Sequence, residues 1–172
     1  MINGFKLQSL IKDTKGNVDI LANKELEYAW WEYGRACNGF ITRDGGMGAL
    51  DFDALILRTL IIDGEAFIRI YKNAKNPYGI TFELLDGLQI DLTKNQKRTA
   101  GQNAIIMGIE VDDAFRPVRY WFREGDEDNY QVGQYKQIPA DEVIHLYRKE
   151  FPNQTRRFWP DCSFTRFIET IG

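Results

Sequence analysis

The sequence predicts an α+β domain in which two N-terminal helices precede a mainly antiparallel β meander. Apolar residues recur every three or four positions between residues 18 and 63, and from residue 65 onward they alternate with polar ones. Aromatic residues make up 13% of the chain, which favours strands or large interfaces. The 172 residues can bury a core of their own, and 44% hydrophobic and 27% charged residues are typical of a globular protein.

The first 39 residues are expected to form a strand, a turn and a helix. Alternation predicts the strand over residues 4–11, and composition predicts the turn at residues 13–17. The helix follows, with Asp19 or Asn23 as its N-cap and Asn38-Gly39 as its end. Its expected apolar face consists of Ile20, Ala22, Leu26, Ala29 or Trp30, Tyr33 and Cys37.

A glycine-rich loop at residues 42–48 separates this helix from a second one. The second helix is expected to begin near Asp51 and to end near Asp63-Gly64, where acidic residues suit its start and glycine its end. Its predicted buried face consists of Leu50, Ala54, Leu57, Leu60 and Ile61.

The remainder of the chain has the pattern of β hairpins. The first hairpin joins residues 65–72 and 80–85 around the turn sequence NPYG at 76–79. Residues 91–103 are polar and are expected on the surface. The later strands are predicted at residues 104–113, 116–124 and, after a short turn, 142–147. Residues 130–138 are expected to form a weak strand or a loop.

Charge and cysteine content narrow the functional classes. The net charge is −3, from 22 basic and 25 acidic residues, so no overall positive charge attracts nucleic acid. Cys37 and Cys162 are too few for a disulfide scaffold and fit a reducing compartment. No apolar stretch approaches about 20 residues, so we expect a soluble intracellular protein.

The chain has one histidine, His145, inside an apolar strand sequence. A Ser-His-Asp or Cys-His catalytic set would have to use this residue, and no serine lies in a GxSxG sequence. The favoured interpretation is a hydrogen-bonded structural histidine. With two distant cysteines, a tetrahedral zinc site is disfavoured, and we expect no metal and no cofactor.

Four acids at the ends of the second predicted helix allow an alternative interpretation in which they bind metal ions. Asp51, Asp53, Asp63 and Glu65 could together serve a metal-dependent nuclease. Helix capping is the favoured explanation, because these acids stand where the helix starts and stops. A Mg²⁺- or Mn²⁺-dependent DNA-cleavage assay would separate the two interpretations.

Three other short segments and a tryptophan pair offer weaker signals. The loop at residues 44–48 lacks a phosphate-binding pattern, the basic stretch at 94–98 lacks interleaved aromatics, and the acidic loop at 124–129 lacks the EF-hand spacing. All three are expected to be solvated loops. Trp30 and Trp31 point about 100° apart on a helix, so one should pack inward and the other needs a second partner.

Six strings in order resemble the lambda-type portal proteins of tailed bacteriophages. The most specific is IPADEVIHLYRKEFPNQTR, together with the DGE turn that precedes an extended strand. The six strings lie at residues 3–9, 22–34, 51–70, 76–86, 108–122 and 138–156.

The resemblance implies a structural, non-enzymatic protein. Portal proteins form a ring of identical subunits at the capsid vertex, where DNA enters and leaves, and terminase and head–tail connector proteins dock on that ring. The location implied is the virion, or the bacterial cytoplasm for a prophage product. Family members are far longer, so this chain would correspond to the peripheral wing region, and alone it should be a monomer or a small oligomer.

The resemblance also marks motif residues for which a structural role is expected. Asp141 is expected to brace the turn before the last strand. The motif residues are Trp30, Asp63, Gly64, Glu65, Pro139, Ala140, Asp141, Val143, His145 and Arg156.

The predicted wing-like domain covers residues 1–155, and residues 156–172 form a tail that departs from the family. Translating allowed codons for the tail one base further on gives an apolar, helix-like segment of the kind the family continues with. The hypothesis is a frameshift in a prophage remnant, and its alternative is a divergent but genuine end. A different phage-derived or adaptor-type interaction module without catalysis is the runner-up to the portal fragment.

Overall fold

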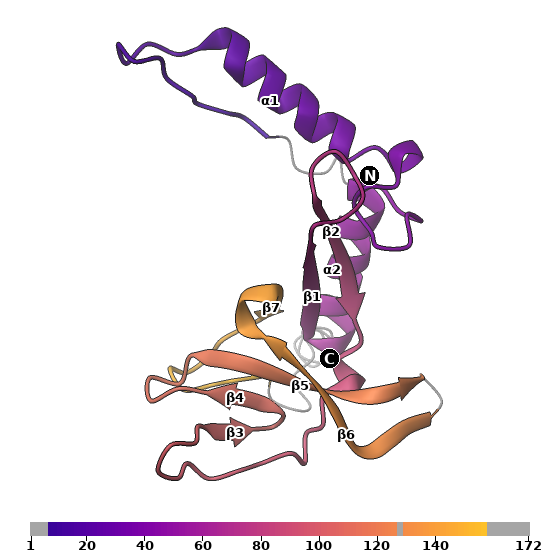
Figure 1. Ribbon diagram of the computed structural model, residues 1–172, viewed down its shortest axis with the longest axis vertical. Helices are drawn as coiled ribbons and strands as arrows, with labels where there is room; N and C mark the ends of the chain where they lie inside the picture. Colours follow the sequence, from indigo (N-terminus) through magenta and orange to yellow (C-terminus); the bar gives the residue numbers. More distant parts are fainter. Residues whose placement is uncertain (1–6, 127–128, 158–172) are drawn as a thin grey trace, which may run out of the picture. The chain divides into compact units, whose positions relative to one another are not determined.

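A computed structural model describes residues 7–126 and 129–157, with the backbone alone for residues 125–126 and 129–133. The chain divides into a first unit, Met1–Leu55 with Tyr71–Phe82, and a second unit, Ile56–Ile70 with Glu83–Gly172. Two helices precede all the strands, which confirms the predicted α+β class (Figure 1). Among the described residues, no helix has the length and apolar character needed to cross a membrane.

Helix α1 (Ile20–Tyr33) begins as predicted and ends earlier than predicted. The Asp19 side chain accepts a hydrogen bond from the Ala22 amide at 3.0 Å. The helix stops before Gly34, and Ala36–Asn38 form a separate 3-10 turn, η1. The predicted continuation to Gly39 was therefore wrong, because Gly34 has little helical propensity and interrupts the pattern.

The strand predicted at residues 4–11 is not present in its described part. Residues 7–11 belong to no strand and run beside α1 instead, as Figure 1 shows. The Asn23 side chain takes the place of a partner strand: its Oδ1 accepts from the Ile11 amide at 2.8 Å, and its Nδ2 donates to the Ile11 carbonyl at 3.1 Å. The predicted turn at 13–17 is confirmed.

The predicted faces of the two helices are correct only in part: Tyr33 is buried, and Ala22, Ala29 and Leu60 are half-buried, whereas the other predicted members are exposed. In α1 only Asn23 and Tyr33 are buried. In α2 (Ala49–Asp63) the buried residue is Phe52, with Leu55 and Ile56 partly buried, so the inward face is rotated from the predicted one. Apolar periodicity identifies an apolar stripe on a helix, but it does not show which part of the protein packs against that stripe. The exposed members of the predicted faces are Ile20, Leu26, Trp30, Cys37, Leu50, Ala54, Leu57 and Ile61.

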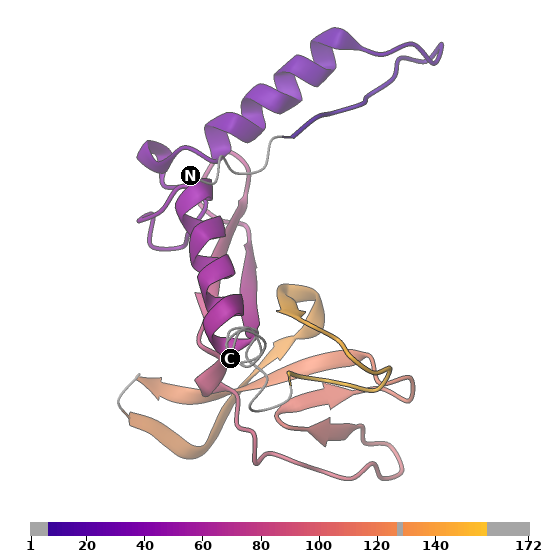
Figure 2. The same ribbon diagram turned by 180° about the vertical axis from the view of Figure 1, so that it is seen from behind.

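The sheets contain the strands predicted for the second half of the chain. One sheet has the order β2-β1-β7, from β2 (Ile80–Leu85), β1 (Glu65–Lys72) and β7 (Val143–Tyr147). The other has the order β3-β4-β5-β6 and is antiparallel throughout; its strands are seen from both sides in Figures 1 and 2. Its members are β3 (Ala104–Ile106), β4 (Ile109–Val111), β5 (Pro117–Asp126) and β6 (Asn129–Pro139).

The strand predicted over residues 104–113 is in fact a tight hairpin of β3 and β4. Met107 (φ 49°) and Gly108 (φ 79°) form its turn, and both have positive φ. A Cβ on Gly108 would lie 2.5 Å from Ile90 Cγ2, so this position also requires glycine for space. The apolar sequence IIMGI conceals the turn, because methionine is not a typical turn residue.

The core of the second unit lies between its strands and a 3-10 turn, η2 (Gly87–Gln89), that follows β2. Asp91, which was expected on the surface, is buried, whereas most of residues 92–103 are exposed as predicted. The buried core residues are Phe67, Ile90, Ile109, Val111, Tyr120, Phe122, Ile138 and Val143.

Two predictions fall partly or wholly outside the described residues. Of the loop expected at residues 124–129, residues 124–126 belong to β5 and Asn129 to β6, so these positions are strand instead; residues 127–128 lie outside the described residues. The tail predicted at 156–172 is described only at Arg156 and Arg157, so its origin and the boundary at residue 155 stay predictions.

Candidate functional site

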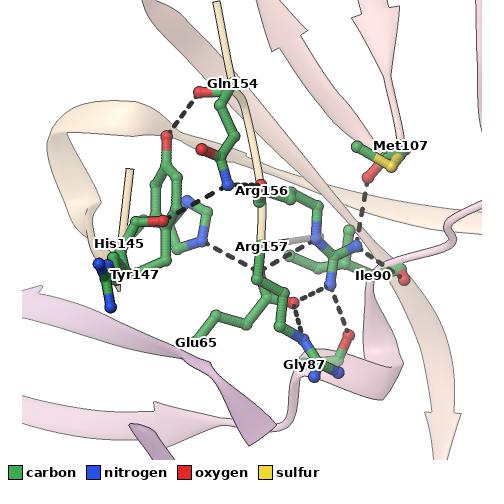
Figure 3. A network of polar contacts seen from close by, with 10 residues as sticks. Glu65, Gly87, Ile90, Met107, His145, Tyr147, Gln154, Arg156 and Arg157 are labelled. Carbon is green, nitrogen blue, oxygen red and sulfur yellow. Dashed lines mark hydrogen bonds and ion pairs between the residues drawn. The ribbon is translucent and has the colours of Figure 1, made fainter. Parts of the chain in front are cut away.

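A buried ionic cluster in the second unit gathers three of the motif residues. Glu65, the first residue of β1, has a side chain only 2% exposed. It is placed there because α2 ends at Asp63 and Gly64 turns the chain in a left-handed conformation (φ 76°). We call Glu65, His145, Tyr147, Gln154, Arg156 and Arg157 the Glu65 cluster (Figure 3).

Arg156 provides the main charge opposite Glu65. Its guanidinium is 3% exposed and contacts both carboxylate oxygens, Oε2 through Nε at 3.3 Å and Oε1 through Nη2. It also donates to three backbone carbonyls, those of Gly87 at 3.3 Å, Ile90 at 3.4 Å and Met107 at 3.3 Å. One side chain therefore ties β1, η2 and the β3–β4 turn together.

His145 is the strand histidine that the sequence predicted, and it is hydrogen-bonded. Its Nε2 lies 3.3 Å from Glu65 Oε2, and its ring stacks on Phe67 with centroids 4.1 Å apart. A carboxylate only accepts hydrogen bonds, so Nε2 carries the proton in this arrangement. The other ring nitrogen, Nδ1, is buried and has no hydrogen-bond partner in the part of the chain that the structure describes.

The charges shift the ionisation of both groups. Burial alone would raise the pKa of Glu65, but hydrogen bonds from His145 and Arg156 and the charge of Arg156 outweigh it and lower that pKa to about 2. Burial lowers the pKa of His145 and exceeds the opposing effect of Glu65. Glu65 is therefore ionised and His145 neutral near neutral pH.

The segment that carries Arg156 folds back on β7. We call residues 148–156 the strap. The Tyr147 hydroxyl donates to the Gln154 carbonyl at 2.7 Å. The Gln154 side chain accepts from the Glu150 amide at 2.6 Å and donates to the Arg156 carbonyl at 2.8 Å. These bonds give the strap a fixed path toward Glu65.

The Glu65 cluster is suited to a structural role, because both carboxylate oxygens of Glu65 are engaged in contacts and the carboxylate is inaccessible. The four acids of the nuclease alternative provide no support for a metal site: within residues 7–126 and 129–157 no group of three or more potential ligands is placed to hold a metal ion. Asp51 lies in the first turn of α2 and Asp63 is its last residue, so both stand at the ends of the helix, and their capping role stays a prediction.

The other motif residues lie elsewhere. Pro139 ends β6, Ala140 and Asp141 begin the 3-10 turn η3 (Ala140–Glu142), and Val143 starts β7 and is buried. The bracing role of Asp141 stays a prediction. Trp30 lies in the first unit, where it is 47% exposed; Trp31 is 55% exposed, so the expectation that one of them packs inward was wrong.

Those tryptophans line a groove in the first unit, with a volume of about 600 Å³. Glu27, Asp51 and Asp53 add carboxylates to its lining and Arg35 adds one guanidinium, 4.7 Å from the Trp31 ring centroid; burial raises the pKa of Asp53. Apolar parts of the lining come from Leu7, Trp30, Trp31, Ala36, Ala49 and Leu50. The groove is thus aromatic and acidic.

A second polar cluster, around Asp91, escaped the sequence analysis. Asp91 accepts hydrogen bonds from Tyr135 Oη at 2.7 Å and Thr93 Oγ1 at 2.6 Å, and it pairs with Arg123 at 2.8 Å. Burial opposes its ionisation, but these partners outweigh burial and hold the pKa of Asp91 well below its ordinary value. Gln154 was likewise missed, because only the fold brings such polar residues to their partners.

Comparison with known proteins agrees with the resemblance found in the sequence. The sequence model "Phage portal protein, lambda family" matches residues 2–158. A "Probable portal protein" of Halomonas phage phiHAP-1 is 28% identical over 160 residues, covering 91% of this chain. The chain spans 30% of that relative's length. Because the family model matches most of its length, the chain belongs to the lambda family of phage portal proteins.

Proposed function

We propose that this chain supplies the peripheral wing region of a phage portal protein. The family match over residues 2–158 is the observation that carries this proposal. The full-length protein would form a ring at the capsid vertex, through which DNA is packaged and ejected and on which terminase and head–tail connector proteins dock. Its place is the virion, or the bacterial cytoplasm when it is made from a prophage.

The role proposed for the chain is structural. The Glu65 cluster supports this role, because it fastens distant segments and leaves no accessible acid–base pair. DNA would pass the ring with little direct binding by this region, which fits a net charge of −3.

Copies of the same chain are the proposed partners of the first unit. Apolar side chains that a monomer would leave in water line α1 and its flanking segment, and the groove beside Trp30 and Trp31 continues this surface. In a ring each subunit covers a different surface of the next one, so such a patch is expected at the contact. The exposed apolar residues are Leu10, Val18, Ile20, Leu21, Leu26, Tyr28, Trp30 and Trp31.

Sedimentation velocity over a range of concentrations tests the partner surface. We expect the chain to be a monomer that associates weakly into small oligomers, and we expect the double variant Trp30→Ser/Trp31→Ser to remain monomeric. The matched control is Leu88→Ser/Leu92→Ser, which removes two exposed leucines of the second unit, 70% and 52% exposed, and should associate like the parent. Circular dichroism establishes that both variants keep their helices.

The possible outcomes distinguish a failure of the proposed contact surface from a failure of the proposed portal role. Association that survives the tryptophan changes would contradict the assigned surface and leave the portal role standing. The gene neighbourhood tests the role itself: we expect a terminase large-subunit gene just upstream and a head-maturation protease gene just downstream. Neighbours unrelated to phage assembly would count against the portal role.

A further inference from the structure

The Glu65 cluster contains the chain's only histidine in a position where a second proton has no acceptor. The His145 side chain is 4% exposed, and its Nε2 already donates to Glu65. Protonation would place a hydrogen on Nδ1, which is buried and has no partner among the described residues. A buried donor without an acceptor is costly, and a buried charge more so.

The charged groups near His145 act on its charged form in opposite directions: Glu65 favours an imidazolium, whereas the charge of Arg156 opposes it. Glu65 of β1 is the one carboxylate of the cluster, and it also faces two guanidiniums, Arg156 and Arg157 of the C-terminal segment. Tyr120 of β5 and Tyr147 of β7 contribute neutral rings with centroids 5.7 Å and 4.4 Å from the imidazole. An imidazolium would therefore compete with Arg156 for a single anion.

The strap is the element that depends on this balance. Arg156 ends the strap and holds Glu65, while Tyr147, two residues after His145, holds the strap through the Gln154 carbonyl. A change in the charge of the His145 ring therefore affects two contacts of the strap: the ion pair of Arg156 with Glu65, and the hydrogen bond from Tyr147 to Gln154.

We propose that His145 is a proton-sensitive latch, which in its neutral form lets Arg156 fasten the strap to Glu65 and in its charged form loosens it. The latch is closed above the ordinary imidazole range and opens as acidification charges the ring. The titration of His145 can be distinguished from that of Glu65, because the Glu65 carboxylate is strongly stabilised as an anion and takes up its proton only in much stronger acid.

Proton NMR of the chain tests the latch directly, because a single histidine gives one set of ring signals. The His145 ring and the backbone amide of Glu150, which donates to Gln154, are followed from about pH 7 to about pH 4, because the pKa of His145 is lowered from its ordinary value. We expect both signals to titrate with one midpoint. Hydrogen exchange of the Glu150 amide, corrected for intrinsic rate, should accelerate about tenfold or more over the same range.

The variants His145→Asn and His145→Phe both remove the titrating group. His145→Asn retains a hydrogen-bond donor for Glu65, and His145→Phe retains an aromatic ring that can stack on Phe67. We expect the Glu150 amide to lose its pH response in either variant. The proposal is overturned if the ring titrates in the parent while the Glu150 amide stays unchanged, or if the response persists in both variants. The titration of the parent chain decides the matter even if neither variant folds.

Discussion

Arg156 binds the carboxylate of Glu65 in the interior of the second unit, although 91 positions of sequence separate the two residues. Sequence inspection placed both in motifs of the family but gave no reason to pair them. The pairing joins the end of a helix to the end of a β meander, and most of the testable consequences of this fold follow from it.

Replacement of Arg156 by methionine would leave Glu65 buried without its cation. We expect the free energy of unfolding, measured by urea denaturation, to fall by about 3–5 kcal/mol. Arg156→Lys should recover only part of that loss, because an ammonium cannot reach Glu65 and three carbonyls from one planar group. Arg148→Met is the control, since Arg148 is 77% exposed and its removal should change stability by less than about 0.5 kcal/mol. Equal losses at both positions would contradict the burial of the pair.

The Glu65 pair also predicts a particular sensitivity to acid. The pKa of Glu65 falls from 4.5 to about 2 on folding, so its contribution to stability is complete above about pH 4.5 and is lost as the pH drops toward about 2. Linkage puts this contribution at up to about 3 kcal/mol. Urea midpoints of the parent and of Glu65→Gln should converge as acid is added, whereas Glu124→Gln, at an exposed position, should follow the parent. Parallel curves for Glu65→Gln and the parent would rule out the assigned ionisation.

Gly108 in the β3–β4 turn has a matched control in Gly101, which precedes β3. Gly108 and Gly101 both have a φ of 79°, but a Cβ would meet Ile90 Cγ2 at 2.5 Å in the former and nothing within 4 Å in the latter. Gly101→Ala should cost about 1 kcal/mol from backbone strain, and Gly108→Ala about 1–3 kcal/mol more from overpacking. Chemical denaturation measures the difference, and similar losses for the two variants would disprove the close packing of the turn on Ile90.

In the first unit, Asn23→Ala tests whether one side chain holds the extended segment on α1. The change removes both bonds to Ile11, so we expect the Ile11 amide to exchange about tenfold faster while the helix amides stay protected. Lys24→Ala, at the adjacent exposed position, should leave that exchange unchanged. Hydrogen exchange read by mass spectrometry resolves the segment, and an unchanged rate in Asn23→Ala would show that other contacts hold it.

The sequence predicted the order and type of the main elements because periodicity and turn residues are local signals. It identified the hairpin of β1 and β2 and the end of α2 at Asp63-Gly64. It failed where a side chain took a role usually filled by backbone, as at Asn23, and where an unusual residue made a turn, as at Met107. The faces of α1 and α2 were predicted only in part, because periodicity identifies an apolar stripe but not the neighbour that covers it.

The candidate site was predictable only in part. His145 was expected to be a hydrogen-bonded strand residue, and it is. The sequence does not identify Glu65 as its partner, because an acid next to the end of a predicted helix already has a local explanation. Gln154 and the carbonyls of Gly87, Ile90 and Met107 give no sequence signal, since their role depends on where the strap crosses the sheet.

The long separation of Glu65 from Arg156 also bears on how this chain is made. A ribosome adds Glu65 first, and 91 positions of chain separate it from the arginine that completes its charge. During that interval β1 cannot bury an ionised carboxylate at low cost, so the nascent sheet stays open at that end. We therefore expect closure of the second unit to be a late event of synthesis, set by the emergence of residue 156 from the exit tunnel.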